Sequence, residues 1–447
     1  MKAIIRLDCN ERTPSPSVNA RISRHYRPGD VVNVIDSVPG DEFDNDDEWY
    51  KLDNGAYIWS GAADIQYEDD ELLPADRQQF LVCYRMVNPN ARPNLDTTAV
   101  PNRLYAAPVK LPIANDSIRL NTLEPNLFAA GVINSLADLP KERSNVLIYI
   151  HGWQMSPDIP TNLFFRFVRN YMRHSSNTIA KVIFFTWPAH DNRKRADDRA
   201  MESGKAFTKN NLFECFTPLS KALHDRNMQL HLLVHSFGHQ LLNGMLNPDP
   251  AFVNNLPNKL FDKVFLMAAD ITHRAATTDG VLLENYFGDD DREDLFYCYR
   301  NLNQLARNVY LFHSKYDYLL YISTKKFIGR KRLNRAETEA ERIALTQHYR
   351  NLGNYGVTQL TANDLQFDPI DLNELPEESI GEDRLNFPFR QLKGTSSGMK
   401  IDQVWSDWNY EGINDLQVIF RARKIPNHHR YLFTCRAVVS KVMELLA

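Results

Sequence analysis

The chain has 447 residues, 43% of them hydrophobic and 24% charged, and a formal net charge of −4. This length allows a sizeable core and at least one additional domain, and the balanced charge excludes a general attraction to nucleic acid or to an anionic membrane surface. The five cysteines are scattered and never in C-x-x-C spacing, which argues against a disulfide framework or a zinc site. We expect no metal and no cofactor.

Residues 1–63 are predicted to form a small all-β domain. Residues 27–38 and 48–62 are rich in β-branched and aromatic residues, and Asn54-Gly55 favours a type I′ hairpin in the second segment. A Pro-Gly turn, a strand, an acidic loop and then WYKLDNGAYIW resemble the bacterial SH3-like domains that are often appended to hydrolases.

Two roles remain open for this SH3-like domain. It either packs as a cap on the larger domain or binds a ligand, and the resemblance implies a peptide or a cell-wall component. Exposure of Trp49, Tyr57 and Trp59 would favour binding, and burial of all three would favour the cap. Residues 64–79 are predicted to be a linker.

From residue 80 to residue 447, apolar strands alternate with helices. We predict strands at 80–87, 146–153, 180–188, 230–236, 262–270 and 308–317, and helices at 162–176, about 195–223 and 239–246. Continuous apolar strands separated by helices are typical of an α/β fold, a mostly parallel sheet covered on both faces. The alternation stops at about 325–415, which we interpret as an insertion before a last strand at 416–422.

The segment LHLLVHSFGHQLLNGML places Ser236 where a strand gives way to a helix. This is the position of the serine in a nucleophile elbow, a sharp and strained turn that exposes the hydroxyl above the sheet. Gly238 supplies the small residue two positions later, but Val234 stands where the G-x-S-x-G pattern has glycine. The departure indicates either a different crossing of strand and helix or an ordinary turn serine.

Further motifs extend the pattern beyond the serine. The strand at 146–153 ends in HGW, the next in TWP, and later strands are followed by AAD and SKYD. Together with HSFG, these motifs resemble the α/β-hydrolase superfamily, and within it a bacterial esterase/lipase-like group. The resemblance implies that the backbone N–H groups of Trp153 and Phe237 form an oxyanion hole.

The chain order of serine, acid and histidine is also that of the α/β-hydrolases. It implies a catalytic triad of Ser236, Asp317 and His429. Asp270, after the preceding strand, is the alternative acid and otherwise braces a nearby loop. His428 is the alternative base, but in the resembling group the histidine stands two residues before an aromatic, which selects His429.

The implied reaction is hydrolysis of a carboxylic ester, with lipid esters among the candidate substrates, through an acyl-enzyme. The basic run at 325–335 is either a solvated helix face or a lid edge that meets anionic phospholipid headgroups. The alternative function is a non-catalytic scaffold or binding protein of the same fold, targeted to a partner by its SH3-like domain.

Other histidines are interpreted as structural. His231, His235 and His239 recur every four residues, but the junction of strand and helix at Ser236 prevents them from sharing one helical face, which argues against a metal site. His151 of HGW is expected to hydrogen-bond within the oxyanion loop rather than to act as a base.

No window has the uninterrupted apolar length of a secretory signal or of a membrane span. We therefore expect no transmembrane segment. A cytoplasmic location is the default expectation, and it leaves signal-independent export open.

Overall fold

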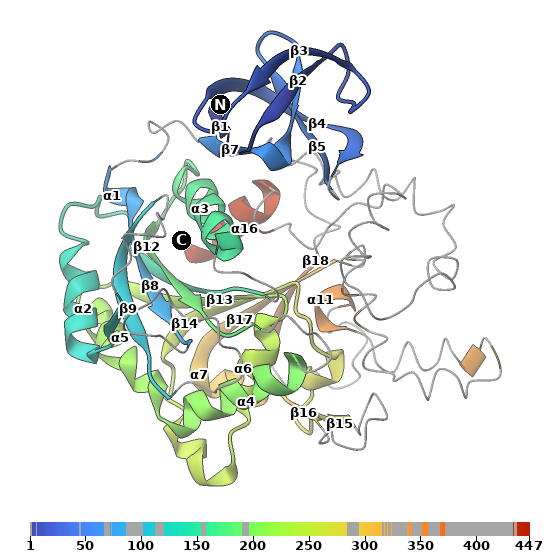
Figure 1. Ribbon diagram of the computed structural model, residues 1–447. Coiled ribbons are helices and arrows are strands. Elements are labelled where there is room, and N and C mark those ends of the chain that lie inside the picture. Colours follow the sequence, from blue (N-terminus) through green and yellow to red (C-terminus); the bar gives the residue numbers. More distant parts are fainter. Residues whose placement is uncertain are drawn as a thin grey trace. The chain divides into compact units, whose positions relative to one another are not determined.

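The computed structural model divides into two compact units, Met1–Leu73 with Glu377–Ala437, and Pro74–Pro376 with Val438–Ala447 (Figure 1). No helix in the described parts of the chain is long and apolar enough to cross a membrane. The residues that the structure describes are 2–5, 7–43, 46–66, 72, 74–85, 102–111, 120–152, 158–189, 196–283, 295–314, 317, 320, 323, 338, 340–341, 351–355, 367–371, 432 and 436–447.

The first unit contains one seven-stranded antiparallel sheet in the order β3-β2-β6-β5-β4-β1-β7. Alternate residues such as Val32, Val34 and Ile58 form a small core of its own. The prediction of a small all-β domain is confirmed. The strands are β1 (Lys2–Ile5), β2 (Cys9–Thr13), β3 (Arg21–Tyr26), β4 (Val31–Phe43), β5 (Asp46–Leu52), β6 (Tyr57–Trp59) and β7 (Ala63–Gln66).

The hairpin between β5 and β6 forms where it was predicted, but the type I′ assignment is wrong. A type I′ turn needs positive φ at both central residues, and of the pair Asn54-Gly55 only Gly55 has it, at 80°. The Asn54 side chain instead accepts a hydrogen bond of 3.0 Å from the amide of Ala56. This side-chain contact helps to close a longer loop without the mirror-image turn.

The three aromatic residues of this domain have unequal exposure. Trp49 is buried, and its Nε1 donates to the carbonyl of Asp41 at 2.8 Å. Tyr57 and Trp59 are half-buried. The three residues are neither all exposed, as expected for a ligand-binding domain, nor all buried, as expected for a cap. Their exposure therefore does not decide between these two roles.

The second unit contains a nine-stranded sheet in the order β10-β9-β8-β12-β11-β13-β14-β17-β18. All neighbours from β8 to β18 are parallel, and β9 and β10 add an antiparallel edge. The strands are β8 (Gln78–Cys83), β9 (Tyr105–Lys110), β10 (Asn121–Thr122), β11 (Asn145–Ile150), β12 (Ile179–Thr186), β13 (Gln229–His235), β14 (Phe261–Met267), β17 (Ala306–His313) and β18 (Phe367–Asp371). A separate two-stranded ribbon contains β15 (Val281–Leu283) and β16 (Leu295–Tyr297).

Helices cover both faces of this sheet, which confirms the predicted α/β architecture (Figure 1). Helices α2, α4, α5 and α6 lie on one face, and α3 and α16 lie on the other. Every residue of β11 and β12 is buried, which explains their continuous apolar sequences. The helices are α1 (Pro74–Arg77), α2 (Pro125–Asn134), α3 (Asp158–Met172), α4 (Ala196–Lys209), α5 (Thr217–His224), α6 (Gly238–Leu246), α7 (Leu302–Leu305), α11 (Leu352–Tyr355) and α16 (Arg436–Leu446).

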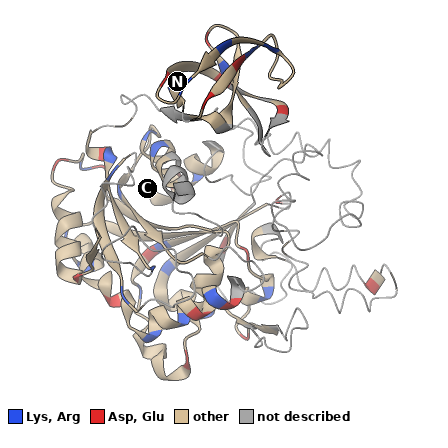
Figure 2. Ribbon diagram, viewed as in Figure 1, with Lys and Arg blue, Asp and Glu red and all other residues tan. Residues whose placement is uncertain are grey.

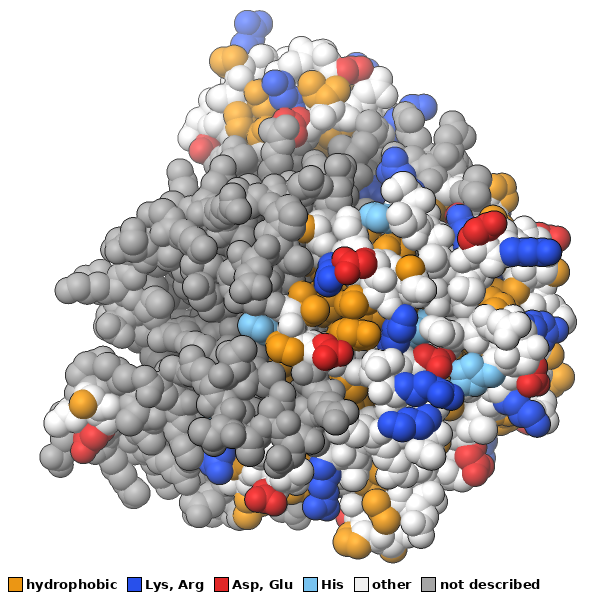
Figure 3. Space-filling model, turned by 180° about the vertical axis from the view of Figure 1, so that it is seen from behind, with side chains coloured by type: hydrophobic (Ala, Val, Ile, Leu, Met, Phe, Trp, Pro, Cys, Tyr) orange, Lys and Arg blue, Asp and Glu red, His pale blue; other side chains and the backbone are white. Residues whose placement is uncertain are grey.

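Charged residues belong mostly to the helices and connections of this unit rather than to its central strands (Figure 2). Seen from behind, the described surface carries basic and acidic residues intermingled, with apolar atoms between them (Figure 3). This distribution agrees with the absence of a strong net charge in the sequence.

Strand β18 lies inside the range that was interpreted as an insertion, and it pairs in parallel with β17. Its sequence, FDPID, lacks the continuous apolar pattern of the other parallel strands. Among the described residues β18 ends the sheet order and pairs with β17 alone, a position in which Pro369 is tolerated. The predicted last strand at 416–422 lies outside the described residues.

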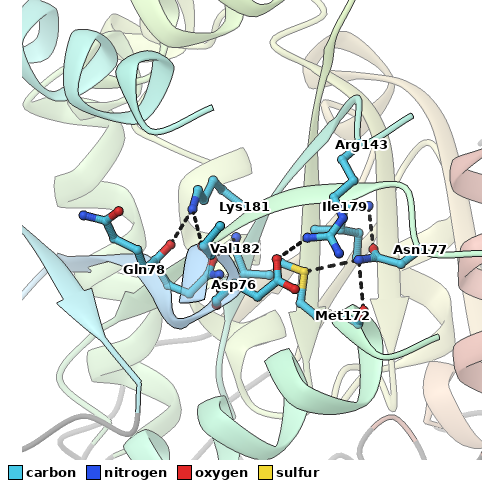
Figure 4. Close-up of polar contacts among 10 residues, drawn as sticks. Asp76, Gln78, Arg143, Met172, Asn177, Ile179, Lys181 and Val182 are labelled. Atoms are coloured by element: carbon cyan, nitrogen blue, oxygen red, sulfur yellow. Dashed lines mark hydrogen bonds and ion pairs between the residues drawn. The ribbon is translucent and has the colours of Figure 1, made fainter. Parts of the chain in front are cut away.

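Buried polar side chains at the amino ends of the strands hold neighbouring segments (Figure 4). Lys181 of β12 donates to the carbonyls of Ala75 and Gln78 at 2.8 and 2.7 Å, and burial lowers the pKa of this amine to about 8. Asp76 of α1 pairs with Arg143 beside it. These contacts attach the segment before β8 to the sheet.

Helix α16 is held at the same edge by its last carbonyl groups. The Lys263 ammonium donates to the carbonyl of Leu445, and Asn145 Nδ2 lies 3.3 Å from the carbonyl of Leu446. Asn145 Oδ1 accepts from His231 Nε2 at 2.8 Å. These side chains satisfy carbonyls that a helix end leaves without a partner.

Candidate active site

Ser236 lies between the end of β13 and the start of α6, and its φ is 53°. This left-handed backbone conformation is unfavourable for a residue with a side chain, and it is the strained geometry of a nucleophile elbow. The Ser236 amide donates to Met267 at 3.0 Å, and its carbonyl accepts from the amides of His239 and Asp270 at 3.1 and 3.4 Å. The turn is therefore held by β14 as well as by the helix.

Two glycines allow the HG loop after β11 to pack directly against this turn. A Cβ at position 152 would lie 2.9 Å from the Cβ of Ser236 and 3.3 Å from its Oγ. A Cβ at position 238 would lie 2.7 Å from the carbonyl oxygen of His151. Both contacts are too close for any side chain, so Gly152 and Gly238 together set the fit between the two segments.

Val234 is compatible with the elbow despite replacing glycine. Its side chain is fully buried, and its Cγ1 lies 3.3 Å from the position that a Cβ of Gly238 would take. The valine thus fills space beside Gly238, and Ser236 keeps its left-handed conformation. The left-handed conformation of Ser236 argues against an ordinary turn serine, one of the two interpretations of this departure.

Phe237, the predicted oxyanion donor, is the N-cap residue of α6 and is buried. Its position at a helix N-terminus suits a backbone N–H that stabilises negative charge. Trp153, the second predicted donor, lies outside the described residues, and the described part of its loop ends at Gly152.

His151 is hydrogen-bonded at both ring nitrogens. Nδ1 lies 2.7 Å from the carbonyl of Gly152, and Nε2 lies 3.2 Å from the Thr186 hydroxyl and 3.4 Å from Arg85. Burial, followed by the neighbouring positive charge of Arg85, lowers the pKa of His151 to about 3. The ring is neutral near pH 7 and fully engaged, as expected for a structural histidine of the oxyanion loop.

The two candidate acids have different surroundings. Asp317 follows β17, is fully buried, and its Oδ1 accepts from the amide of Leu320 at 3.1 Å. Asp270 follows β14, and its Oδ1 accepts from the hydroxyl of Ser323 and from Asn351, the latter at 3.0 Å. The carboxylate of Asp270 thus braces the segments around Ser323 and Asn351, which is its predicted alternative role.

The histidines that recur every four residues take separate positions. His231 contacts Asn145 near the opposite edge of the sheet. His239, on α6, donates from Nε2 to the carbonyl of Val234 at 3.0 Å and has Nδ1 2.8 Å from the Tyr299 hydroxyl. His235 is buried at the end of β13, where its Nδ1 would lie 3.4 Å from a Cβ at position 152.

The structure brings together some of the predicted site and not the rest. Ser236, Phe237 and Asp317 all follow the carboxyl ends of parallel strands, so they lie at one edge of the sheet. His429, His428 and the basic run at 325–335 lie outside the described residues. Assembly of the triad therefore stays a prediction.

Sequence reasoning assigned no role to Arg85, Thr186 and Trp187, which surround His151. Arg85 Nε donates to the Thr186 hydroxyl at 2.8 Å, and Trp187 Nε1 donates to the His151 carbonyl at 2.9 Å. The TWP motif at the end of β12 was the available signal for two of them, but a motif alone does not reveal its contacts.

Comparison with known proteins agrees with this geometry. No curated protein matches the chain. Residues 132–377, more than half of the chain, match the model of a family described as "Alpha/beta hydrolase of unknown function (DUF900)". The matched range contains Ser236, the HG loop and both candidate acids, and on this match the chain belongs to that alpha/beta hydrolase family.

Proposed function

We propose that this α/β-hydrolase is a serine hydrolase that cleaves carboxylic esters. The observation that carries the proposal is Ser236, held at φ 53° between β13 and α6 with Gly152 packed against its side chain. A strained non-glycine conformation at the carboxyl edge of a parallel sheet is costly, and such strain persists chiefly at functional sites.

In the proposed reaction the Ser236 oxygen attacks the ester carbonyl carbon while His429 takes the hydroxyl proton. The negative charge on the carbonyl oxygen is stabilised by the backbone N–H groups of Phe237 and Trp153. The alcohol leaves with the proton from His429, and water then hydrolyses the acyl-enzyme by the same steps. Asp317 orients the imidazole and stabilises its protonated form.

The substrate class is a carboxylic ester, with lipid esters as the specific candidates. A lid edge within 325–335 is the proposed contact for anionic phospholipid headgroups. A peptide or a cell-wall component is the proposed ligand of the N-terminal β domain, whose Tyr57 and Trp59 are half-buried rather than buried. A chain-length series of p-nitrophenyl esters beside a phospholipid panel would identify the acyl group.

A fluorophosphonate probe tests the nucleophile directly, because it forms a covalent bond only with an activated serine. We expect the wild-type protein to be labelled and the Ser236→Ala variant not to be. Ser220→Ala is a matched control, because Ser220 is also buried but lies on α5 and donates to the carbonyl of Leu260. A folded wild-type protein that never reacts would instead support a non-catalytic scaffold.

The base is tested by comparing adjacent histidines. His429→Ala should lower turnover by several orders of magnitude with little effect on folding, and His428→Ala should lower it much less. The reverse ranking would assign the base to His428. Near-normal activity in the double variant would remove the triad.

The acid is tested by paired amide substitutions. Asp317→Asn should lower kcat strongly because the histidine would lose its orienting carboxylate. Asp270→Asn should mainly lower the melting temperature, since this carboxylate bonds Ser323 and Asn351. A larger loss of kcat in Asp270→Asn would move the acid to that strand.

A further inference from the structure

The end of β12 contacts both segments that carry the predicted oxyanion donors. Thr186 and Trp187 are buried side by side, one bonded to the His151 ring and the other to the His151 carbonyl. The Trp187 ring also stacks on Phe237, with centroids 6.3 Å apart and planes at 13°, and on His151 at 5.8 Å and 21°. Trp187 therefore lies between the HG loop and the elbow.

The hydrogen bonds around His151 have only one consistent direction. A carbonyl can only accept, so the bond to Gly152 requires the proton on Nδ1, and Nε2 must be an acceptor. Thr186 accepts from Arg85 Nε and is therefore free to donate its own proton to Nε2. The order is Arg85 to Thr186 to His151 to the Gly152 carbonyl, and it holds one tautomer of the ring.

This chain of bonds bears on the proposed oxyanion hole because it fixes the end of the HG loop that packs against Ser236. His151 Nδ1 donates to the Gly152 carbonyl, and a Cβ at position 152 would lie 2.9 Å from the Cβ of Ser236. On the other side, the stack on Trp187 restrains Phe237 at the start of α6.

We propose that Thr186 and Trp187 are positioning residues of the oxyanion hole: Thr186 orients the HG-loop peptide through His151, and Trp187 holds that loop at a fixed distance from the elbow. This inference rests on the proposed serine hydrolase activity. It adds Thr186, the last residue of β12, and the following Trp187 to a site otherwise built after β11, β13 and the later strands. It predicts that their loss weakens transition-state stabilisation and leaves substrate binding intact.

The test compares two threonine-to-valine substitutions that each remove one buried hydroxyl at nearly constant volume. Thr186→Val breaks the bond to His151, and Thr208→Val breaks the 2.7 Å bond from α4 to the carbonyl of Met245. We expect Thr186→Val to lower kcat on a p-nitrophenyl ester by about ten- to hundredfold with KM within about twofold. Thr208→Val should leave kcat near the wild-type value. Thr186→Ser keeps a hydroxyl at position 186 and should have a kcat close to wild type, unlike Thr186→Val.

The affinity for a trifluoromethyl ketone is a second measurement, and a general loss of protein stability should not change it. This compound adds to the catalytic serine and places an oxyanion in the hole, so its affinity should fall by the same factor as kcat in Thr186→Val. Trp187→Phe keeps an aromatic ring but loses the Nε1 donor to His151, and it should lower both quantities by a smaller, matching factor. It also serves if Thr186→Val does not fold.

The outcomes distinguish failure of the positioning role of Thr186 and Trp187 from failure of the proposed serine hydrolase activity. If wild type turns over ester through Ser236 but Thr186→Val and Trp187→Phe match Thr208→Val in kcat and ketone affinity, the positioning role is wrong and the hydrolase activity stands. If kcat falls while ketone affinity is unchanged, the positioning role is also wrong. If wild type shows no Ser236-dependent turnover, both proposals fail together.

Discussion

His151 lies at the carboxyl edge of the larger sheet and His231 lies near its amino edge, and burial lowers the pKa of both imidazoles to about 3. Their bonding differs. Both nitrogens of His151 have hydrogen-bond partners, and the adjacent Gly152 touches the catalytic candidate Ser236. His231 bonds Asn145 through Nε2, and its Nδ1 has no partner among the described residues.

The lowered pKa of these two histidines thus reflects their burial and does not show which of them lies at a catalytic site. At the amino edge, buried polar groups attach α16 and the segment before β8 to the sheet. At the carboxyl edge, they orient loops around a strained serine. The position along parallel strands therefore separates the two roles, as the general rule for open α/β sheets requires.

The largest loss of activity is expected from Gly152→Ala at the carboxyl edge of the sheet. The added Cβ would lie 2.9 Å from the Cβ of Ser236, so the loop must move away from the elbow. We expect kcat on a p-nitrophenyl ester to fall by about hundredfold or more, because a shift of about 1 Å at a catalytic site has that effect.

Gly131→Ala is the matched control for this substitution. Gly131 lies within α2, and a Cβ there would meet nothing within 4 Å. Activity should be unchanged, and the free energy of unfolding should rise by about 0.5–1 kcal/mol because alanine favours a helix. Equal activity in both variants would mean that the HG loop does not approach the serine in solution.

The next effect concerns pH and uses His151→Phe and His231→Phe. Because both folded-state pKa values lie below the ordinary value of 6.5, the unfolded chain binds protons that the folded chain does not bind as pH falls from 6.5 toward 3. Each histidine therefore contributes to a loss of stability on acidification. Either substitution should flatten the dependence of the unfolding free energy on pH, measured by urea denaturation between pH 5 and 7.

Activity separates the two histidines where stability does not. His151→Phe should lower kcat because the Gly152 carbonyl loses its donor, whereas His231→Phe should leave kcat near wild type. A drop in kcat of similar size in both variants would show that the two edges are functionally coupled and would contradict the division drawn above.

The smallest effect on activity is expected from Lys263→Met at the amino edge. This change removes the donor to the Leu445 carbonyl, and it should lower the free energy of unfolding by about 1–3 kcal/mol. Lys221→Met, at an exposed position of α5, should change stability by less than about 0.5 kcal/mol. Both should keep wild-type kcat, and a selective loss in Lys263→Met would indicate that α16 positions the base.

Much of the fold was predictable because its strands are buried on both faces. Continuous apolar runs identified β11, β12, β13 and β14, with every end placed one to three residues away from its observed position, and the elbow followed from HSFG between a strand and a helix. Strand β18 was missed because FDPID has neither alternation nor an apolar run, and only its pairing with β17 makes it a strand.

The backbone turns of the candidate site were predictable from the sequence, but the side chains that contact those turns were not. Ser236 and the HG loop have local motifs, because their roles depend on backbone turns that few residues allow. The roles proposed for Thr186 and Trp187 depend on their contacts with His151 after β11, and such contacts depend on strand register and side-chain direction rather than on local sequence. The type I′ assignment failed for a related reason, since the loop is closed by a backbone bond from Leu52 to Ala56 together with the Asn54 side chain, a combination that the Asn-Gly pair alone does not reveal.

The interlocking of Gly152 with Ser236, and of Gly238 with the His151 carbonyl, gives a criterion for sorting relatives of this chain. In a relative that keeps the serine, no smaller residue elsewhere can make room for a side chain, because position 152 meets the Cβ of Ser236 and position 238 meets the backbone carbonyl of His151. A family member with a larger residue at one of them needs a different loop path. Such members are the ones to examine first for loss of hydrolysis and for gain of a purely binding role.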